Sequence, residues 1–357
     1  MKQVTHGELQ QLLKKCYEAK LPLFIWGAPG IGKSTAVKDA AKKIAASSGT
    51  KFSETEIENG KFGFVDVRLS QLDSSDLRGI PVIRDDTTKW ALPSFLPRNS
   101  IGSGILFLDE LNLAPPLVQN AAYQLILDRK LGDYRLPDGW LIICAGNRLE
   151  DSRSIFEMSA PLANRMAHTE LKIPSIEEWT EWALTNGIDS RIVAFLNMNI
   201  SMLYAYDSKT KEKTFPTPRS WAFCSKLIKN VSKIDELELL VPSVVGSATG
   251  NFVGFLKLSA KLDVNRILAN PKSVEEILEP SLKFILLSLV SDEFRKVPKN
   301  GEKCLAVCKH MQAEFGCLLL RFMKAADGTS WNKLMMSTKI GDELLDKYKS
   351  YFTDAGD

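Results

Sequence analysis

The chain has little cysteine and no long apolar segment. Six cysteines are scattered along its 357 residues, which is too few for a disulfide scaffold and fits a reducing compartment. Residues 1–10 are polar and lack the apolar core of a secretory signal. The apolar stretch at residues 284–290 is far too short to span a bilayer, so it predicts a buried helix. We therefore expect a cytoplasmic protein that is not inserted in a membrane.

A large excess of charge of one sign is also lacking. The chain has 46 basic and 43 acidic residues and a net charge of +3, which gives no electrostatic argument for a nucleic acid or an anionic membrane as partner. No internal repeat or low-complexity tract is found. One short cluster, made of Cys304, Cys308, His310 and Cys317, matches no common zinc spacing. We expect these cysteines to pack in a helical core, since free cysteine is among the most buried residue types.

A glycine-rich segment at residues 27–34 follows a mostly apolar run and reads G-x-x-x-x-G-K-S. Its glycines let backbone N–H groups turn toward phosphate oxygens. Lys33 would then reach the β- and γ-phosphates, and Ser34 would hold a magnesium ion. The helix predicted over residues 34–46 directs its N-terminal dipole at the same anion. The predicted nucleotide-binding residues are Gly27, Ala28, Pro29, Gly30, Ile31, Gly32, Lys33, Ser34 and Thr35.

Short apolar strands alternate with amphipathic helices over the first half of the chain. This alternation predicts a mainly parallel sheet flanked by helices, as in a P-loop NTPase, over residues 1–174. Such sheets bind ligands at the carboxyl ends of their strands, where the glycine-rich loop lies. The predicted strands are 21–26, 62–68, 104–108, 140–145 and 168–173, and the helices between them include 34–46 and 115–130.

The pattern changes after Pro174. Ser175 and Glu178 form a capping-box signature, which predicts the start of a helix. From there to the end the periodicity is helical, so residues 175–357 predict an all-α lid and a C-terminal helical region. Glycines at 246, 250 and 254 recur every four residues, which predicts close packing of one helix on another.

Two carboxylates end the apolar strand predicted at residues 104–108. A buried strand would deliver Asp109 rigidly to the magnesium shell, and Glu110 would deprotonate the water that attacks the γ-phosphate. The alternative is a strand that happens to end in acidic residues. Asn147 follows the strand at 140–145 and would reach the γ-phosphate or the attacking water, although asparagine is also common in turns.

Two arginines stand out by position. Arg165 precedes the last predicted strand, and Arg219 opens a helix after a Pro-Thr-Pro segment. A planar guanidinium suits the charge that develops in phosphoryl transfer, although most arginines are solvated surface charges. Arg148 and Arg153 are alternatives for the same role.

Together these residues resemble an AAA+ ATPase, and within that class the MoxR group. Residues 27–34 match Walker A and residues 105–110 match Walker B. Asn147 matches sensor 1, Arg165 the arginine finger and Arg219 the sensor 2 arginine. Residues 73–81 with 90–97 are similar to the MoxR insert, and residues 131–140 to the hairpin before sensor 1. The resemblance covers about residues 5–230; the Ala-Asn-Arg-Met finger segment departs from the usual Asp-Arg-Phe.

The resemblance implies ATP and Mg²⁺ as cofactors and a ring-shaped homo-oligomer, often a hexamer. ATP would lie between subunits, so Arg165 would act on the neighbour's nucleotide and Arg219 would act from the lid. MoxR-type ATPases remodel partner proteins, often ones with a von Willebrand factor A domain, and loops 76–84 and 133–136 would contact the partner. The alternatives are a nucleic-acid motor or loader, and a nucleotide switch without hydrolysis. Nothing is recognised after about residue 235.

Overall fold

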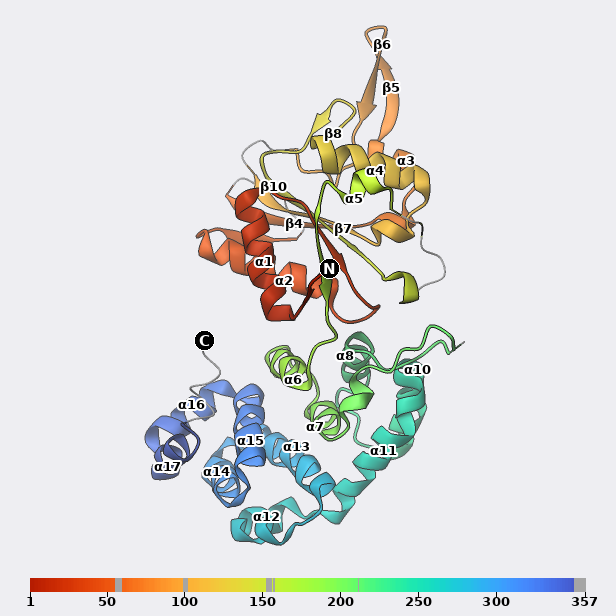
Figure 1. Cartoon of the computed structure of the whole chain (residues 1–357). Coiled ribbons are helices and arrows are strands. Elements are labelled where there is room, and N and C mark those ends of the chain that lie inside the picture. Colours follow the sequence, from red (N-terminus) through yellow and green to blue (C-terminus); the bar gives the residue numbers. More distant parts are fainter. Residues whose placement is uncertain (55–59, 99–101, 152–155, 157, 211, 350–357) are drawn as a thin grey trace. The chain divides into compact units, whose positions relative to one another are not determined.

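The computed structural model describes residues 1–54, 60–98, 102–151, 156, 158–210 and 212–349 (Figure 1). The chain divides into two compact units. The first contains Met1–Pro174 together with Asp207–Lys209, and the second contains Ser175–Tyr206 and the chain from Thr210 onward. The boundary follows Pro174, where Ser175 caps the first helix of the second unit through a complete capping box with Glu178.

The first unit is built on a seven-stranded parallel sheet with the order β1-β11-β2-β10-β7-β4-β3. The strands are β1 (Gln3–Val4), β2 (Leu23–Trp26), β3 (Lys51–Ser53), β4 (Lys61–Arg68), β7 (Ser103–Asp109), β10 (Gly139–Gly146) and β11 (Ala167–Leu171). All five predicted strands are confirmed. The short strands β1 and β3 were not predicted, since neither has an apolar run that sequence periodicity could reveal.

Helices cover both faces of this sheet, as Figure 1 shows. On one face lie α1 (His6–Ala19) and α2 (Lys33–Ser47), and on the other lie α3 (Ser74–Arg78) and α4 (Pro116–Asp128). Successive strand residues point to opposite faces. Leu106, Leu108 and Ile142 accordingly join one core cluster with Val118 and Leu125 of α4. Each such side chain contributes about 1.5–3 kcal/mol when it is fully buried. The predicted α/β fold with helices on both faces is confirmed.

Two antiparallel hairpins extend the first unit. One is formed by β5 (Ile80–Arg84) and β6 (Thr87–Ala91), and the other by β8 (Lys130–Leu131) and β9 (Tyr134–Arg135). In Figure 1 the β5–β6 hairpin projects away from the sheet. The short helix α5 (Ala160–Ala163) precedes β11.

The second unit is helical wherever the structure describes it, apart from its connecting loops. Its core gathers apolar side chains from nearly all of its helices. Within α13 the residues Ile285, Leu286, Leu287 and Val290 are buried, which confirms the predicted buried helix. Its α-helices are α6 (Ile176–Thr185), α7 (Ser190–Met198), α8 (Pro218–Leu227), α9 (Ile234–Leu240), α10 (Pro242–Val245), α11 (Thr249–Lys257), α12 (Val264–Ala269), α13 (Pro280–Lys296), α14 (Gly301–His310), α15 (Ala313–Ala326), α16 (Gly328–Ser337) and α17 (Lys339–Lys347).

The cysteines of the predicted core cluster are packing residues. Cys304 and Cys308 lie on α14 and are fully buried. Burial raises the pKa of Cys304 to about 12 and raises that of Cys308 well above its ordinary value. Among the described residues, no group of three or more His, Cys, Asp or Glu side chains is placed to hold a metal ion. The expectation of core packing is confirmed for these two residues.

The glycines at 246, 250 and 254 do not pack against another helix. Gly250 and Gly254 face open space, with no neighbouring atom within 4 Å of a side-chain carbon built on either. Gly246 lies where α10 ends, in a left-handed conformation. The prediction of close helix packing was wrong, because spacing alone does not say on which side of a helix the core lies.

One helical run in the described chain, Ile234–Lys261, is long and apolar enough to cross a membrane by length and composition alone. The run is not one continuous α-helix, since it breaks at Pro242 and at Gly246 into α9, α10 and α11. Its residues Val241, Phe252 and Phe255 lie in the core of the second unit. A core helix passes the same test, so the run is a weak indication of a membrane span.

Candidate functional site

The glycine-rich loop joins the end of β2 to the start of α2. Gly30 and Gly32 adopt φ angles of 77° and 96°, a left-handed conformation that only glycine reaches without strain. These two residues turn the chain so that α2 begins at Lys33, with its N-terminal N–H groups at the loop. Ser34 is partly buried in the first turn of α2, whereas Thr35 is exposed.

Lys33 is buried and points back into the loop. Its side chain is 9% exposed, and its Nζ donates to the carbonyl oxygens of Gly27 at 2.7 Å and Ala28 at 3.0 Å. A third bond at 3.0 Å reaches Oδ1 of Asn147, beyond the end of β10. An ammonium group has three N–H donors, so these bonds satisfy the buried charge. The structure thus brings Lys33 and Asn147 together.

Ser34 and Asp109 also meet at this edge of the sheet. The Ser34 hydroxyl donates to Oδ2 of Asp109 at 2.9 Å, and Asp109 is 7% exposed at the end of β7. Strand order explains the encounter. Because β10 lies between β2 and β7 in a parallel sheet, the three strands end at the same edge. A hydroxyl and a carboxylate therefore lie side by side at the first turn of α2.

Glu110 has an unusual backbone conformation. Its φ of 58° lies in the left-handed region, which costs a residue other than glycine of order 1–3 kcal/mol. Its N–H donates to Oδ1 of Asp109 at 2.9 Å, and its Oε2 accepts a hydrogen bond from the hydroxyl of Ser70. Ser70 lies two residues beyond the end of β4. The turn that follows the neighbouring strand thereby holds the Glu110 carboxylate in place.

Negative charge accumulates beside this carboxylate. Loss of hydration, followed by repulsion from the Asp109 carboxylate, raises the pKa of Asp66 on β4 to about 6. The positive charges of Arg68 and Lys38 oppose the shift, and Glu110 adds to it. The carboxylates of Asp109 and Glu110 therefore act on the carboxyl group of Asp66, and a bound cation would relieve this repulsion.

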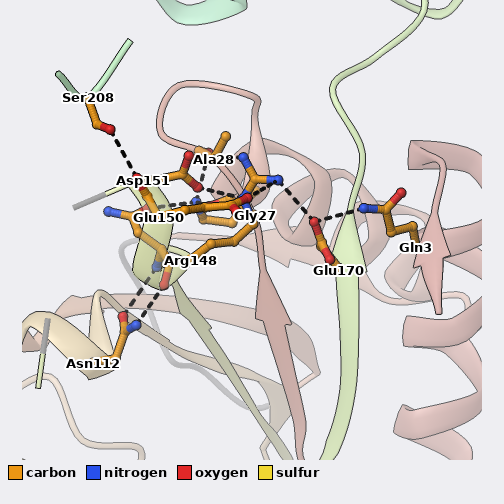
Figure 2. A network of polar contacts seen from close by, with 11 residues as sticks. Gln3, Gly27, Ala28, Asn112, Arg148, Glu150, Asp151, Glu170 and Ser208 are labelled. Atoms are coloured by element: carbon orange, nitrogen blue, oxygen red, sulfur yellow. Dashed lines mark hydrogen bonds and ion pairs between the residues drawn. The ribbon is translucent and has the colours of Figure 1, made fainter. Parts of the chain in front are cut away.

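Arg148 is held by carboxylates on three sides (Figure 2). Its guanidinium donates to Asp151 at 2.6 and 2.9 Å and pairs with Glu170 of β11 at 3.2 Å and with Glu150 at 3.0 Å. Its hydrogen bond to Asp151 is the largest factor raising its pKa. The main chain of Glu150 in turn accepts a hydrogen bond from Ser208 at 3.0 Å. These bonds fix the turn that follows Asn147 and leave Arg148 committed to partners within its own chain.

The comparisons with known proteins agree with this geometry. Residues 22–166, less than half of the chain, match the family described as AAA domain (dynein-related subfamily). That segment contains the loop, both carboxylates, Asn147 and Arg165. Residues 22–166 are thus similar to an AAA domain, and the match indicates that this part of the chain is an ATPase.

No curated protein matches the chain. Among solved structures it is similar to NtrX from Brucella abortus in complex with ADP, with 14% identity and a TM-score of 0.42 over 83% of this chain and 68% of that one. It is also similar to a mutant of Thermotoga maritima RuvB, with 16% identity and a TM-score of 0.36 over 77% of this chain and 85% of that one. Likenesses this distant carry no argument about function.

The two predicted arginines lie in different units. Arg165 follows α5 in the AAA domain and is exposed, and no hydrogen bond of its side chain to the described part of the chain is found. Arg219 is exposed in the first turn of α8, behind the cap formed by Thr217, in the second unit. The alternative Arg148 is engaged as described above, and Arg153 lies outside the described residues.

Three residues of the AAA domain's site were not predicted from the sequence. Ser70 bonds Glu110, His6 contacts the glycine-rich loop through its Nε2 and the carbonyl of Ile31 at 3.0 Å, and Asn112 bonds the backbone of Asn147. A polar residue just beyond a strand, the signal used for Asn147, also fits Ser70. No sequence signal indicates His6, because its contact depends on how α1 packs.

Proposed function

We propose that this chain is a MoxR-like AAA+ ATPase that hydrolyses ATP with Mg²⁺ to remodel a partner protein in the cytosol. One observation carries the proposal. Hydrogen bonds from Ser34 to Asp109 and from Lys33 to Asn147 gather a hydroxyl, a carboxylate, an ammonium and an amide at the loop. These are the groups that phosphoryl transfer requires.

The donor set fits magnesium. Mg²⁺ prefers oxygen ligands and is held by one or two protein groups together with phosphates and water. The Ser34 hydroxyl and the Asp109 carboxylate already lie 2.9 Å apart, and we propose that both hold the ion. When bound, Mg²⁺ supplies positive charge against the phosphate oxygens. Asp66 and Glu110 add negative charge nearby that favours a cation.

Each remaining residue has a proposed role in hydrolysis. Lys33 and the loop N–H groups bind the phosphates, since Lys33 can exchange its bond to Asn147 for one to a phosphate oxygen. Glu110 accepts a proton from the attacking water. Asn147 orients that water through its side-chain amide. Because the water must lie between Glu110 and Asn147, both residues have to be held in place, as their hydrogen bonds indicate.

The β5–β6 hairpin is our candidate for the partner-binding surface. Its side chains Ile80, Ile83 and Trp90 are 65%, 83% and 36% exposed, and exposed apolar groups gathered on one element mark contact sites. Trp90 lies beside the turn of the second hairpin, since a side-chain carbon built at Gly132 would lie 3.7 Å from its ring. We propose that both hairpins contact the partner, a protein of the von Willebrand factor A type.

Replacing Ile83 with aspartate tests this surface. We expect Ile83→Asp to keep the ATPase rate of the isolated protein, because the hairpin lies outside the site, and to lose at least tenfold in affinity for the partner. The partner is first captured by affinity purification with a Glu110→Gln variant and then titrated in purified form. Leu239→Asp is the matched control, since Leu239 is 77% exposed on α9. Equal affinity of both variants for the partner would show that the β5–β6 hairpin is not the partner-binding surface.

The exposed Arg165 suggests action on a neighbouring subunit in a ring, with Arg219 acting from the lid. We expect Arg165→Ala and Glu110→Gln to be inactive separately and to regain activity when mixed. In a mixed ring, an interface with Glu110 on one side and Arg165 on the other is complete. Random 1:1 mixing gives about a quarter of wild-type activity in such head-to-tail assemblies. Failure of the mixture to recover any phosphate release would contradict action in trans.

Phosphate release measured with and without DNA tests the proposal against its rivals. A partner-remodelling ATPase releases phosphate from ATP and is indifferent to DNA. Stimulation by DNA with a steep salt dependence would indicate a nucleic-acid motor instead. Binding of ATP without any release would indicate a switch. The exposed apolar hairpin and the near-neutral charge both favour the protein partner.

A further inference from the structure

Within the part of the chain that the structure describes, the Asn112 side chain hydrogen-bonds only the backbone of Asn147. Asn112 lies in the short 3-10 turn Leu111–Leu113, just after Glu110, and is 1% exposed. Its Nδ2 donates to the carbonyl oxygen of Asn147 at 2.7 Å, and its Oδ1 accepts from the N–H of Asn147 at 3.2 Å. Figure 2 shows two dashed lines from the Asn112 side chain. The two bonds engage the peptide groups on either side of the Asn147 Cα.

These two hydrogen bonds take the place of pairing with β7. β10 pairs with β7 up to the partners Cys144 and Leu108, but β7 ends at Asp109, where the chain turns into Glu110. The backbone groups of Asn147 therefore have no strand of β7 beside them. The Asn112 amide has both donors and an acceptor, as the backbone does, and it supplies one of each to Asn147 beyond the end of the β10–β7 ladder.

Gly146 is shaped to this contact. A side-chain carbon built on Gly146 would lie 2.2 Å from Oδ1 of Asn112 and 2.7 Å from the ring of Phe24. The φ of Gly146 is not positive, so close approach and not backbone conformation requires glycine here. The absence of a side chain at Gly146 therefore leaves the space that the Asn112 side chain needs to reach Asn147.

We infer that Asn112 is a positioning residue for ATP hydrolysis that acts through Asn147. Asn112 fixes the backbone of Asn147. The position of the Asn147 amide, whose Oδ1 lies 3.0 Å from Nζ of Lys33, then depends only on the rotation of its own side chain. The inference rests on the proposed function, in which Asn147 orients the attacking water. It also joins the Glu110 turn to the Asn147 turn, so the two groups that must hold one water are tied together directly.

Kinetics of single and double variants test this role. We expect Asn112→Ala to lower kcat by about 10- to 100-fold with little change in KM, because misplacing a catalytic group by about 1 Å costs that much. Asn147→Ala should lower kcat at least as far. In the Asn147→Ala background, Asn112→Ala should add nothing, since residues that act through one another are not additive.

Gln119 offers a matched control. It is also a buried amide, 8% exposed, and its Nε2 bonds the backbone oxygen of Ala114 at 3.0 Å. Gln119→Ala removes a similar hydrogen bond in the same domain, so any loss of kcat that it causes should multiply with that of Asn147→Ala. Asn112→Asp keeps the acceptor but sets a second carboxylate oxygen against the Asn147 carbonyl oxygen, so it should lose at least as much kcat as Asn112→Ala. Gly146→Ala, which crowds Oδ1 of Asn112, serves as the test variant if Asn112→Ala does not fold.

Hydrogen exchange gives a reading that does not depend on hydrolysis. The N–H of Asn147 should exchange faster in Asn112→Ala and in Gly146→Ala, and at the wild-type rate in Gln119→Ala. Unchanged protection of the Asn147 N–H in Asn112→Ala would overturn the inference about Asn112. Full kcat in a folded Asn112→Ala, together with a lowered kcat in Asn147→Ala, would overturn it as well and leave the proposed function intact. Full kcat in Asn147→Ala would overturn the role of Asn147 in the proposed function as well.

Discussion

Replacing Glu110 with glutamine is expected to lower the rate of ATP hydrolysis by about 10²- to 10⁴-fold, the contribution typical of a general base. Glutamine keeps the shape of the side chain and can still hydrogen-bond Ser70, but it cannot take a proton from water. ATP affinity should remain near the wild-type value, because the phosphate-binding groups of Lys33 and Ser34 are untouched.

The measurement is phosphate release together with titration of a fluorescent nucleotide. Glu18→Gln provides a matched control, since Glu18 is a carboxylate on α1 that is 48% exposed and pairs only with Lys15 in the described ion pairs. Unchanged turnover in a purified Glu110→Gln variant would falsify the role of Glu110 as base. Loss of nucleotide binding in that variant would show instead that Glu110 supports the fold of the site.

The sequence predicted most of the sheet because its central strands carry their signal locally. β2, β7 and β10 are buried on both faces, so each is a near-continuous apolar run, and β4 is buried over residues 62–65. The edge strands β1 and β3 have only two and three residues. They form because a neighbour offers free backbone groups, which is a property of the folded sheet.

The same distinction holds for the site. Lys33, Ser34 and Asp109 could be predicted because each lies in a motif or at the end of an apolar strand. Ser70 and Asn112 could not, because their importance lies in which group they touch across the sheet edge. The glycine spacing at 246–254 failed for a related reason, since a helical period does not indicate which face is buried.

These unpredicted residues connect the groups of the site to one another through hydrogen bonds. Ser70 holds the Glu110 side chain, the left-handed φ of Glu110 turns the chain into the 3-10 segment, and Asn112 in that segment holds Asn147. Asn147 contacts Lys33. A change at the phosphates can therefore reach both the base and the water-orienting amide through short, direct bonds, with no need for a long-range pathway.

Replacing Lys33 with alanine should weaken nucleotide binding itself by about 10- to 100-fold. A charge-assisted hydrogen bond contributes about 1.5–3 kcal/mol, and about 1.4 kcal/mol corresponds to a tenfold change in Kd. Lys33 must give up part of its bonding to Asn147 or to the loop carbonyls when it meets a phosphate, which keeps the net effect within this range.

The substitution also removes the donor that ties the carbonyls of Gly27 and Ala28, so the loop loses part of its support. Thermal unfolding should therefore accompany the fluorescent-nucleotide titration, to show that the variant is folded. Lys42→Ala is the control, because Lys42 is on the same helix but 50% exposed and paired with Asp39. Wild-type affinity in a folded Lys33→Ala would mean that the phosphates do not lie at the N-terminus of α2. Weakened nucleotide binding by Lys33→Ala, with normal binding by Lys42→Ala, would show that the phosphates are bound by the positive charge at the loop and not by a charge further along the helix.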